Sequence, residues 1–203
     1  MNIINKVDRH IEKVEFDHPV VITVNEFTEK SVLSFSESMS KAQNTGQNVV
    51  PVVIDSFGGA VYSLLAMISI IKQSNIPVAT IVESKAMSCG AVLLTCGDPG
   101  LRFVDRDATV LIHDVSAWAQ GKVEEMKSDI KQATMLNKKI YNIMDRNCGH
   151  KTGYFMGIVD EKKHADWYLN SRELLRHGIA DTTSIPSLCC SVSLNIDIQR
   201  GTK

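Results

Sequence analysis

Three short apolar runs, each followed by a polar or amphipathic stretch, constrain the fold of this chain most strongly. They occupy residues 19–24 (PVVITV), 49–54 (VVPVVI) and 77–82 (PVATIV). Runs that are rich in β-branched residues and apolar on both faces are typical of strands in a parallel sheet covered by helices. After the first and second runs, apolar residues recur at spacings of three and four, which predicts amphipathic helices. The alternation predicts an α/β fold.

The later part of the chain continues this pattern. We predict strands at residues 102–104 and 109–112, a long helix from near Lys122 to about Asn147, and a short helix at 171–177 that ends at Gly178. A chain of 203 residues suits one domain. We assign residues 18–184 to this domain, with an N-terminal arm at 1–17 and a C-terminal tail at 185–203.

Composition excludes several classes of function. The net charge of −1 gives no electrostatic case for binding nucleic acid or an anionic membrane. No apolar run is long enough to span a bilayer, and the polar N-terminus does not resemble a secretory signal. Five cysteines without paired spacing indicate a reducing compartment, which predicts a cytoplasmic location. Cys89 and Cys96 lie seven apart, outside the spacing of structural zinc sites, so we predict no metal and no cofactor.

The strongest catalytic candidate is Ser88. The predicted strand at 77–82 is followed by a polar turn at 83–85 and then by residues 86–91 (AMSCGA), which lead into an apolar helix. This order places Ser88 at the first turn of the helix, where free N–H groups and the positive end of the helix dipole can stabilise an oxyanion. A serine in this position can equally be a simple N-cap.

Two further side chains suit a role beside Ser88. His113 ends the predicted strand at 109–112, and Asp166 lies shortly before the last helix. Open α/β sheets gather their functional groups beyond the carboxyl ends of the strands, so we expect Ser88 and His113 to converge. A histidine can accept the serine proton if an acid fixes its tautomer. A hydrogen-bonded structural histidine and a surface acid are the alternatives.

A pair of glycines supplies a second catalytic feature. Gly58 and Gly59 follow the buried strand at 49–54 and precede a helix. Glycine lets the backbone approach a ligand closely, and the amides at the start of a helix can bind an anion. The amides of Gly59 and Cys89 are therefore the expected pair of oxyanion donors. Two glycines before a helix also form ordinary turns.

Four motifs, taken together and in order, resemble a known family. They are residues 55–61 (DSFGGAV), 86–91 (AMSCGA), 110–113 (VLIH) with 120–121 (QG), and the segment from Asp166 to Asp181. From about residue 19 to 181 the chain resembles the Clp protease proteolytic subunit. Departures from the family pattern are Phe57, which replaces the loop proline, and His164 and Ala165, which stand where an acid and an arginine are common.

The resemblance implies a crotonase-like α/β fold of repeated ββα units with a long protruding handle helix. It also implies a serine endopeptidase in which Ser88 is the nucleophile, His113 the general base and then acid, and Asp166 the residue that orients His113. The amides of Gly59 and Cys89 would form the oxyanion hole. The residues implied to bind the substrate are Gly58, Val115, Ser116, Ala117 and Trp118, the last four by pairing with the substrate as an added strand.

The resemblance further implies a homo-oligomer. In the family, seven subunits form a ring, and the long helix interlocks two stacked rings around a closed chamber. Unfolded proteins or peptides are cut inside this chamber, and an ATP-driven unfoldase is the implied partner. Three alternatives stay open: a viral capsid-maturation protease with the same triad, a crotonase-type acyl-CoA enzyme with the same two-amide oxyanion hole, and a catalytically silent ring subunit.

Overall fold

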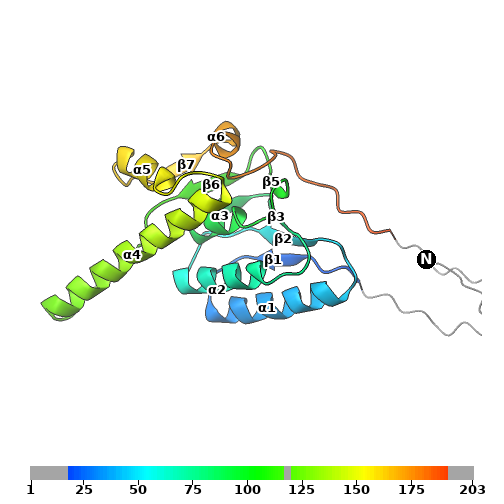
Figure 1. Ribbon diagram of the computed structural model, residues 1–203, viewed down its shortest axis with the longest axis horizontal. Coiled ribbons are helices and arrows are strands. Elements are labelled where there is room, and N and C mark those ends of the chain that lie inside the picture. Colours follow the sequence, from blue (N-terminus) through cyan, green and yellow to red (C-terminus); the bar gives the residue numbers. More distant parts are fainter. Residues whose placement is uncertain (1–17, 117–119, 192–203) are drawn as a thin grey trace, which may run out of the picture.

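Four parallel strands form the main sheet of the molecule. The computed structural model describes residues 18–116 and 120–191. The strands occur in the spatial order β1–β2–β3–β5 (Figure 1), with bounds β1 Ile22–Val24, β2 Val50–Ile54, β3 Val78–Val82 and β5 Arg102–Val104. All three neighbouring pairs are parallel, which confirms the predicted parallel sheet. The first strand is shorter than residues 19–24 because only Ile22–Val24 pair with β2.

Two helices pack side by side next to this sheet (Figure 1). They are α1 (Glu29–Asn44) and α2 (Val61–Lys72), which follow β1 and β2 as predicted. Thr28 caps α1 by accepting a hydrogen bond from the Ser31 amide at 3.1 Å, and the Ser31 hydroxyl accepts one in return from the Thr28 amide at 2.9 Å. This capping box fixes where the helix begins. Three residues at helical spacing, Phe35, Met39 and Ala42, bury the inner face of α1.

A smaller sheet carries the C-terminal half of the domain. Its strands are β4 (Lys85–Met87), β6 (Thr109–Ile112) and β7 (Trp167–Leu169), in the order β4–β6–β7. The pair β4–β6 is parallel and the pair β6–β7 is antiparallel. The predicted turn at residues 83–85 is wrong at its end, because Lys85 already pairs with Thr109 as the first residue of β4. The sequence pattern also did not predict β7.

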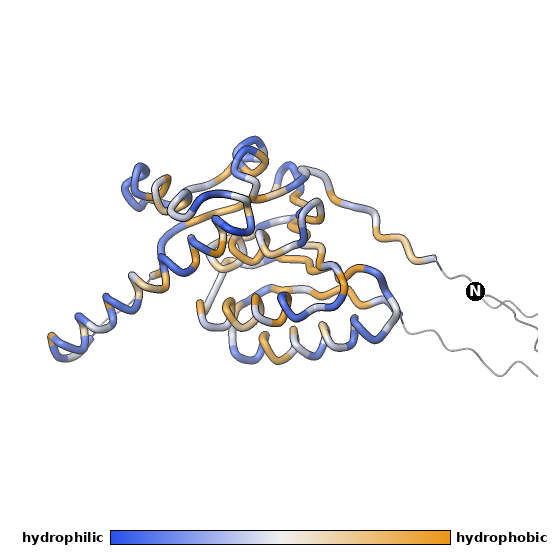
Figure 2. The backbone as a smooth tube through the Cα atoms, viewed as in Figure 1, coloured by the Kyte–Doolittle hydropathy of each residue, from blue (hydrophilic) through white to orange (hydrophobic). Residues whose placement is uncertain are grey.

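Four helices complete the fold: α3 (Cys89–Leu94), α4 (Val123–Asn147), α5 (Tyr154–Glu161) and α6 (Ser171–Arg176). The long helix and the last helix confirm the prediction, whereas α5 was not predicted. The first half of α4 extends away from the rest of the molecule (Figure 1), and most of its residues are hydrophilic (Figure 2). The buried residues of α4 begin only at Ile140, and before that point Gln132 donates a hydrogen bond to the Tyr62 hydroxyl of α2 at 2.8 Å.

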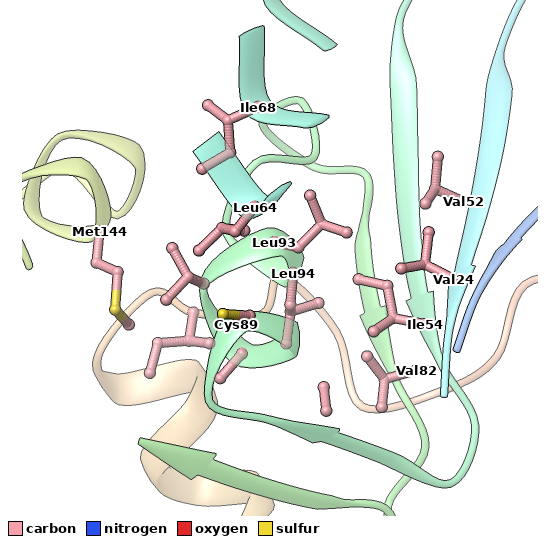
Figure 3. Close-up of a cluster of buried hydrophobic side chains, with 14 of the residues drawn as sticks. Val24, Val52, Ile54, Leu64, Ile68, Val82, Cys89, Leu93, Leu94 and Met144 are labelled. Atoms are coloured by element: carbon pink, nitrogen blue, oxygen red, sulfur yellow. The ribbon is translucent and has the colours of Figure 1, made fainter. Parts of the chain in front are cut away.

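The apolar core surrounds α3. Every residue of this helix is buried, and its side chains contact residues of the main sheet, α2 and α4 (Figure 3). Figure 3 shows Leu64 and Ile68 of α2 on one side of α3 and Val24, Val52 and Ile54 of the sheet on another. Because α3 begins directly after Ser88, the packing of the core also fixes the position of that residue.

An ion pair joins β5 to the segment after α6. Arg102 Nε donates to Asp181 Oδ2 at 2.9 Å, and Arg102 Nη1 donates to the carbonyl oxygen of Gly178 at 2.7 Å. Burial alone would raise the pKa of Asp181, but the hydrogen bonds and charge of Arg102 outweigh it and lower this pKa. The ionised pair therefore stabilises the folded state.

We expect Asp181→Asn to lower the free energy of unfolding by about 3 kcal/mol at pH 7, because it leaves the buried Arg102 without its counter-charge. The pKa of Asp181 is lower in the folded state, so its contribution is present above the ordinary value of 3.8 and is lost as the pH falls through the lower folded value. Urea unfolding at neutral and acid pH measures both effects. The control is Asp107→Asn at an exposed carboxylate, and an equal loss in both variants would contradict the prediction.

Candidate active site

A cavity of about 230 Å³ lies where the loop between β2 and α2, the turn between β4 and α3, and the end of β6 meet α4. Four of the predicted catalytic residues line it: Gly59, Ser88, Cys89 and His113. Its remaining lining is mostly apolar and comprises Phe57, Val61, Val92, Ile112, Val115, Ser116, Ile140, Tyr141 and Met144. The fold thus brings residues from Phe57 to Met144, which are 87 positions apart (144 minus 57), to one cavity.

Ser88 has an unusual backbone conformation. Its φ of 55° and ψ of −118° place a residue with a side chain in a region that favours glycine. Its N–H donates to the carbonyl oxygen of Leu111 at 2.9 Å, which ties the turn to β6. Ser88 occupies the N-cap position of α3, but its side chain makes no capping hydrogen bond. The N-cap interpretation therefore does not explain this serine, and a strained residue held in place by its surroundings is typical of functional sites.

The two glycines of the β2–α2 loop are required by close packing. A Cβ at Gly58 would lie 2.8 Å from the Cβ of Ser88, and a Cβ at Gly59 would lie 2.7 Å from the carbonyl oxygen of Phe27. Both glycines also have positive φ, +110° and +152°. A larger residue at either position would push the loop away from Ser88.

Two backbone amides beside Ser88 have no acceptor among the described residues. The neighbouring amides of Gly58 and Ala60 are bonded, to Ser56 Oγ and to the Phe27 carbonyl. The amides of Gly59 and Cys89 have no such partner, and the latter is the first residue of α3, so it has no acceptor within the helix. The Cys89 thiol lies 3.3 Å from the Gly59 carbonyl oxygen, so the two residues are adjacent. Free donors in this arrangement suit the stabilisation of an oxyanion.

The Cys89 thiol is a poor nucleophile. Burial raises its pKa. The thiolate is the reactive form of cysteine, and a raised pKa keeps Cys89 protonated at neutral pH. The hydroxyl of Ser88 is therefore the better candidate for covalent chemistry at this cavity.

The register of the small sheet relates His113 to Asp166. The β6–β7 ladder ends with Ile112 opposite Trp167, so the next pair in this antiparallel register is His113 with Asp166. Opposite residues of an antiparallel pair project from the same face. His113 is half-buried and lines the cavity, whereas Asp166 is exposed and does not. Among the described residues, no hydrogen bond joins the side chains of Ser88, His113 and Asp166.

The predicted substrate-binding segment is described only in part. Val115 and Ser116 line the cavity, and the Val115 amide donates to Asn137 Oδ1 of α4 at 2.6 Å. Ala117 and Trp118 lie outside the described residues. Gly58 does not line the cavity but packs against Ser88, as described above.

Sequence reasoning missed the polar residues that surround the end of β6. The Tyr141 hydroxyl of α4 donates to Asp114 Oδ1 at 2.9 Å, and burial and the carboxylate of Asp114 raise the pKa of Tyr141. Asp114 directly follows His113, but its partner is 27 positions away. No local pattern in the sequence connects such a pair.

Across residues 18–116 and 120–191, no three or more His, Cys, Asp or Glu side chains gather in a way that could hold a metal ion. Within the same residues, no helix has both the length and the apolar character needed to cross a bilayer.

Comparison with known proteins identifies the family. The profile of the Clp protease family matches residues 10–185. The chain belongs to the Clp protease family. A relative in Streptomyces avermitilis, the ATP-dependent Clp protease proteolytic subunit 2, is 28% identical over 136 residues. The match covers 66% of this chain and 66% of that relative, just under two thirds of its length.

Membership of the Clp protease family confirms the resemblance seen in the motifs. It also confirms the predicted fold class, because family members have the crotonase-like α/β fold and the structure is a mixed α/β domain with a parallel sheet. The family is one of serine peptidases, which is the class of activity that the cavity around Ser88 suits.

Proposed function

We propose that this protein is a serine endopeptidase whose catalytic residues are Ser88, His113 and Asp166. The observation that carries the proposal is that Ser88 and His113 line one cavity together with two residues, Gly59 and Cys89, whose amides have no other partner among the described residues. Membership of the Clp protease family supports the same reaction.

In the proposed reaction these groups act in sequence. The Ser88 hydroxyl attacks the carbonyl carbon of the scissile peptide bond while His113 accepts its proton. The oxyanion of the tetrahedral intermediate accepts hydrogen bonds from the amides of Gly59 and Cys89. His113 then gives the proton to the leaving amine, and a water molecule, activated by the same imidazole, hydrolyses the acyl-enzyme.

Asp166 orients the imidazole in this proposal. Its register position opposite His113 supports the assignment, since a carboxylate on the same face can reach the imidazole ring. We propose that the hydrogen bonds between the three side chains form when substrate binds. Catalytic hydrogen bonds are often long in free enzymes and tighten in the complex.

The proposed substrates are unfolded proteins or peptides. An extended peptide would pair with the backbone after His113, near the cavity-lining residues Val115 and Ser116 and close to Gly58. Because this mode of binding uses the peptide backbone, it requires substrate segments that are not folded.

We propose that the subunits assemble into a heptameric ring, that rings stack in pairs, and that an ATP-driven unfoldase delivers substrates. The projecting half of α4 supports an interface, because four of its apolar side chains are exposed: Val123, Met126, Ile130 and Met135. The relative in Streptomyces is named as ATP-dependent, which agrees with an unfoldase partner. The predicted reducing compartment agrees with a cytoplasmic location.

Labelling with a fluorophosphonate probe on size-separated fractions tests this function. We expect covalent labelling of Ser88, located by mass spectrometry, and its loss in Ser88→Ala and in His113→Ala. Ser34→Ala, at an exposed serine of α1, is the matched control and should label as the wild type does. Labelling confined to large particles would support the ring. Absence of labelling in every fraction would contradict the peptidase and favour a silent subunit or acyl-CoA chemistry.

A further inference from the structure

Asp114, the residue after His113, connects three parts of the fold. Its Oδ1 accepts the hydrogen bond from Tyr141 of α4 at 2.9 Å, and its Oδ2 accepts one from His164 Nδ1 at 2.8 Å. The other ring nitrogen of His164 lies 3.4 Å from Asp160 Oδ1 at the end of α5. A single carboxylate thus joins the end of β6 to α4 and to the segment that leads into β7.

The bond between Asp114 and His164 closes the open end of the β6–β7 ladder. The last paired residues are Ile112 and Trp167, followed outward by His113 and Asp166. Asp114 and His164 lie just beyond them and are joined across the gap. The two proposed catalytic residues are therefore enclosed between the ladder on one side and this hydrogen bond on the other. Without the outer bond, both strand ends would be free to separate.

The backbone before Asp166 is also held in an uncommon conformation. Lys163 and His164 have φ values of 56° and 58°, in the left-handed region. The amide of Lys163 donates to Asp160 O and the amide of His164 to Val159 O, which is a Schellman ending for α5 with lysine where glycine is usual. Such residues persist where their surroundings fix them. The side chain of His164 supplies part of this fixation, because each ring nitrogen faces a carboxylate.

We propose that Asp114 and His164 are positioning residues, which keep His113 and Asp166 opposite each other, and that Tyr141 anchors this pair to α4. The inference rests on the proposed peptidase function. Neither residue touches the reacting atoms. They act through the geometry of the two strand ends, whose displacement by about 1 Å can lower a catalytic rate on the order of 100-fold.

A double-mutant cycle tests the proposal. We expect Asp114→Ala and His164→Ala each to lower kcat for a peptide substrate by about 10- to 100-fold while KM changes little, because substrate contacts are retained. The double variant should lose no more than Asp114→Ala alone, since that variant already removes the bond between Asp114 and His164. Losses that multiply in the double variant would overturn the proposal.

Recovery of kcat by a conservative substitution at His164 distinguishes a positioning role from a general structural role. His164→Asn retains a donor near the position of Nδ1 and should recover most of the kcat that His164→Ala loses. The side chain of His164 is 56% exposed, so its truncation leaves no cavity and should not unfold the protein. Asp107→Ala, at an exposed carboxylate just before β6, is the control and should retain the kcat of the wild type. Equal rates for His164→Asn and His164→Ala, both well below the wild type, would contradict the role of this donor.

Hydrogen exchange provides a measurement that does not depend on activity. In His164→Ala, the amides of residues 113–116 and 165–168 should exchange about tenfold faster than in the wild type, whereas those of the main sheet should not change. Unchanged exchange at these amides overturns the proposal whether or not the wild type is active. Failure of the wild type to react with a fluorophosphonate contradicts the peptidase instead, so the two failures are distinguishable.

Discussion

Asp166→Asn is expected to lower kcat by about 10⁴-fold with little change in stability. An amide cannot carry the negative charge that stabilises the imidazolium, and it can hold the imidazole in the wrong tautomer. Asp166 is exposed and has no hydrogen bond to another described residue, so its replacement should not disturb the fold. Peptide hydrolysis measures kcat, and thermal unfolding shows that the variant is intact.

The same experiment, with Asp114→Asn beside it, decides whether Asp166 or Asp114 orients the imidazole of His113. Asp114 is also close to His113 in the chain, but its two oxygens are bonded to Tyr141 and His164. If Asp166→Asn retains kcat within about tenfold while Asp114→Asn loses about 10⁴-fold, then Asp114 is the orienting acid and the assignment of Asp166 is wrong. Asp107→Asn again serves as the control for the loss of one charge.

Gly58→Ala is expected to lower kcat and the rate of labelling of Ser88 by about 10²- to 10³-fold, the usual cost of losing an oxyanion donor. The added Cβ would lie 2.8 Å from the Cβ and 3.2 Å from the Oγ of Ser88, so the loop must move. The amide of Gly59 would move with the loop, because it is the next residue. Fluorophosphonate labelling, followed over time, measures the effect.

A substitution at a second glycine, Gly100, is the control for backbone strain without a steric contact. Gly100 has φ +84°, and a Cβ there would meet no atom within 4 Å. Gly100→Ala should therefore show the cost of an unfavourable φ in stability alone, without a loss of labelling. Similar rates of labelling in the two variants would contradict a catalytic role for the packing of Gly58 on Ser88.

The main sheet and its helices could be predicted because their patterns are long and local. Residues 49–54 and 77–82 are continuous apolar runs, and α4 maintains its apolar spacing over several turns. The strands β4 (KAM) and β7 (WYL) contain no β-branched residue, the signal by which the other strands could be recognised. The helix α5 has Gly153 at its N-cap and no side-chain cap, so the sequence lacks the usual signals for its start.

In the candidate site, too, some residues could be predicted from local patterns in the sequence and others could not. Ser88 and the pair Gly58–Gly59 could be selected because each follows a buried strand and precedes a helix, a local arrangement that the sequence shows. The positive φ of Ser88 and the bond between Asp114 and His164 could not be predicted from the sequence, because both depend on contacts between distant segments. The partners Asp114 and His164 are 50 positions apart.

All three proposed catalytic residues flank β4, β6 and β7, whose strands contain three, four and three residues. The four-stranded sheet bears none of them. Sheets this small are only marginally stable by themselves, and their stability depends on the elements packed around them. Ala86, Val110 and Trp167 of these strands belong to the same apolar core as the main sheet, so the proposed catalytic residues depend on the packing of the whole domain and not on the small sheet alone.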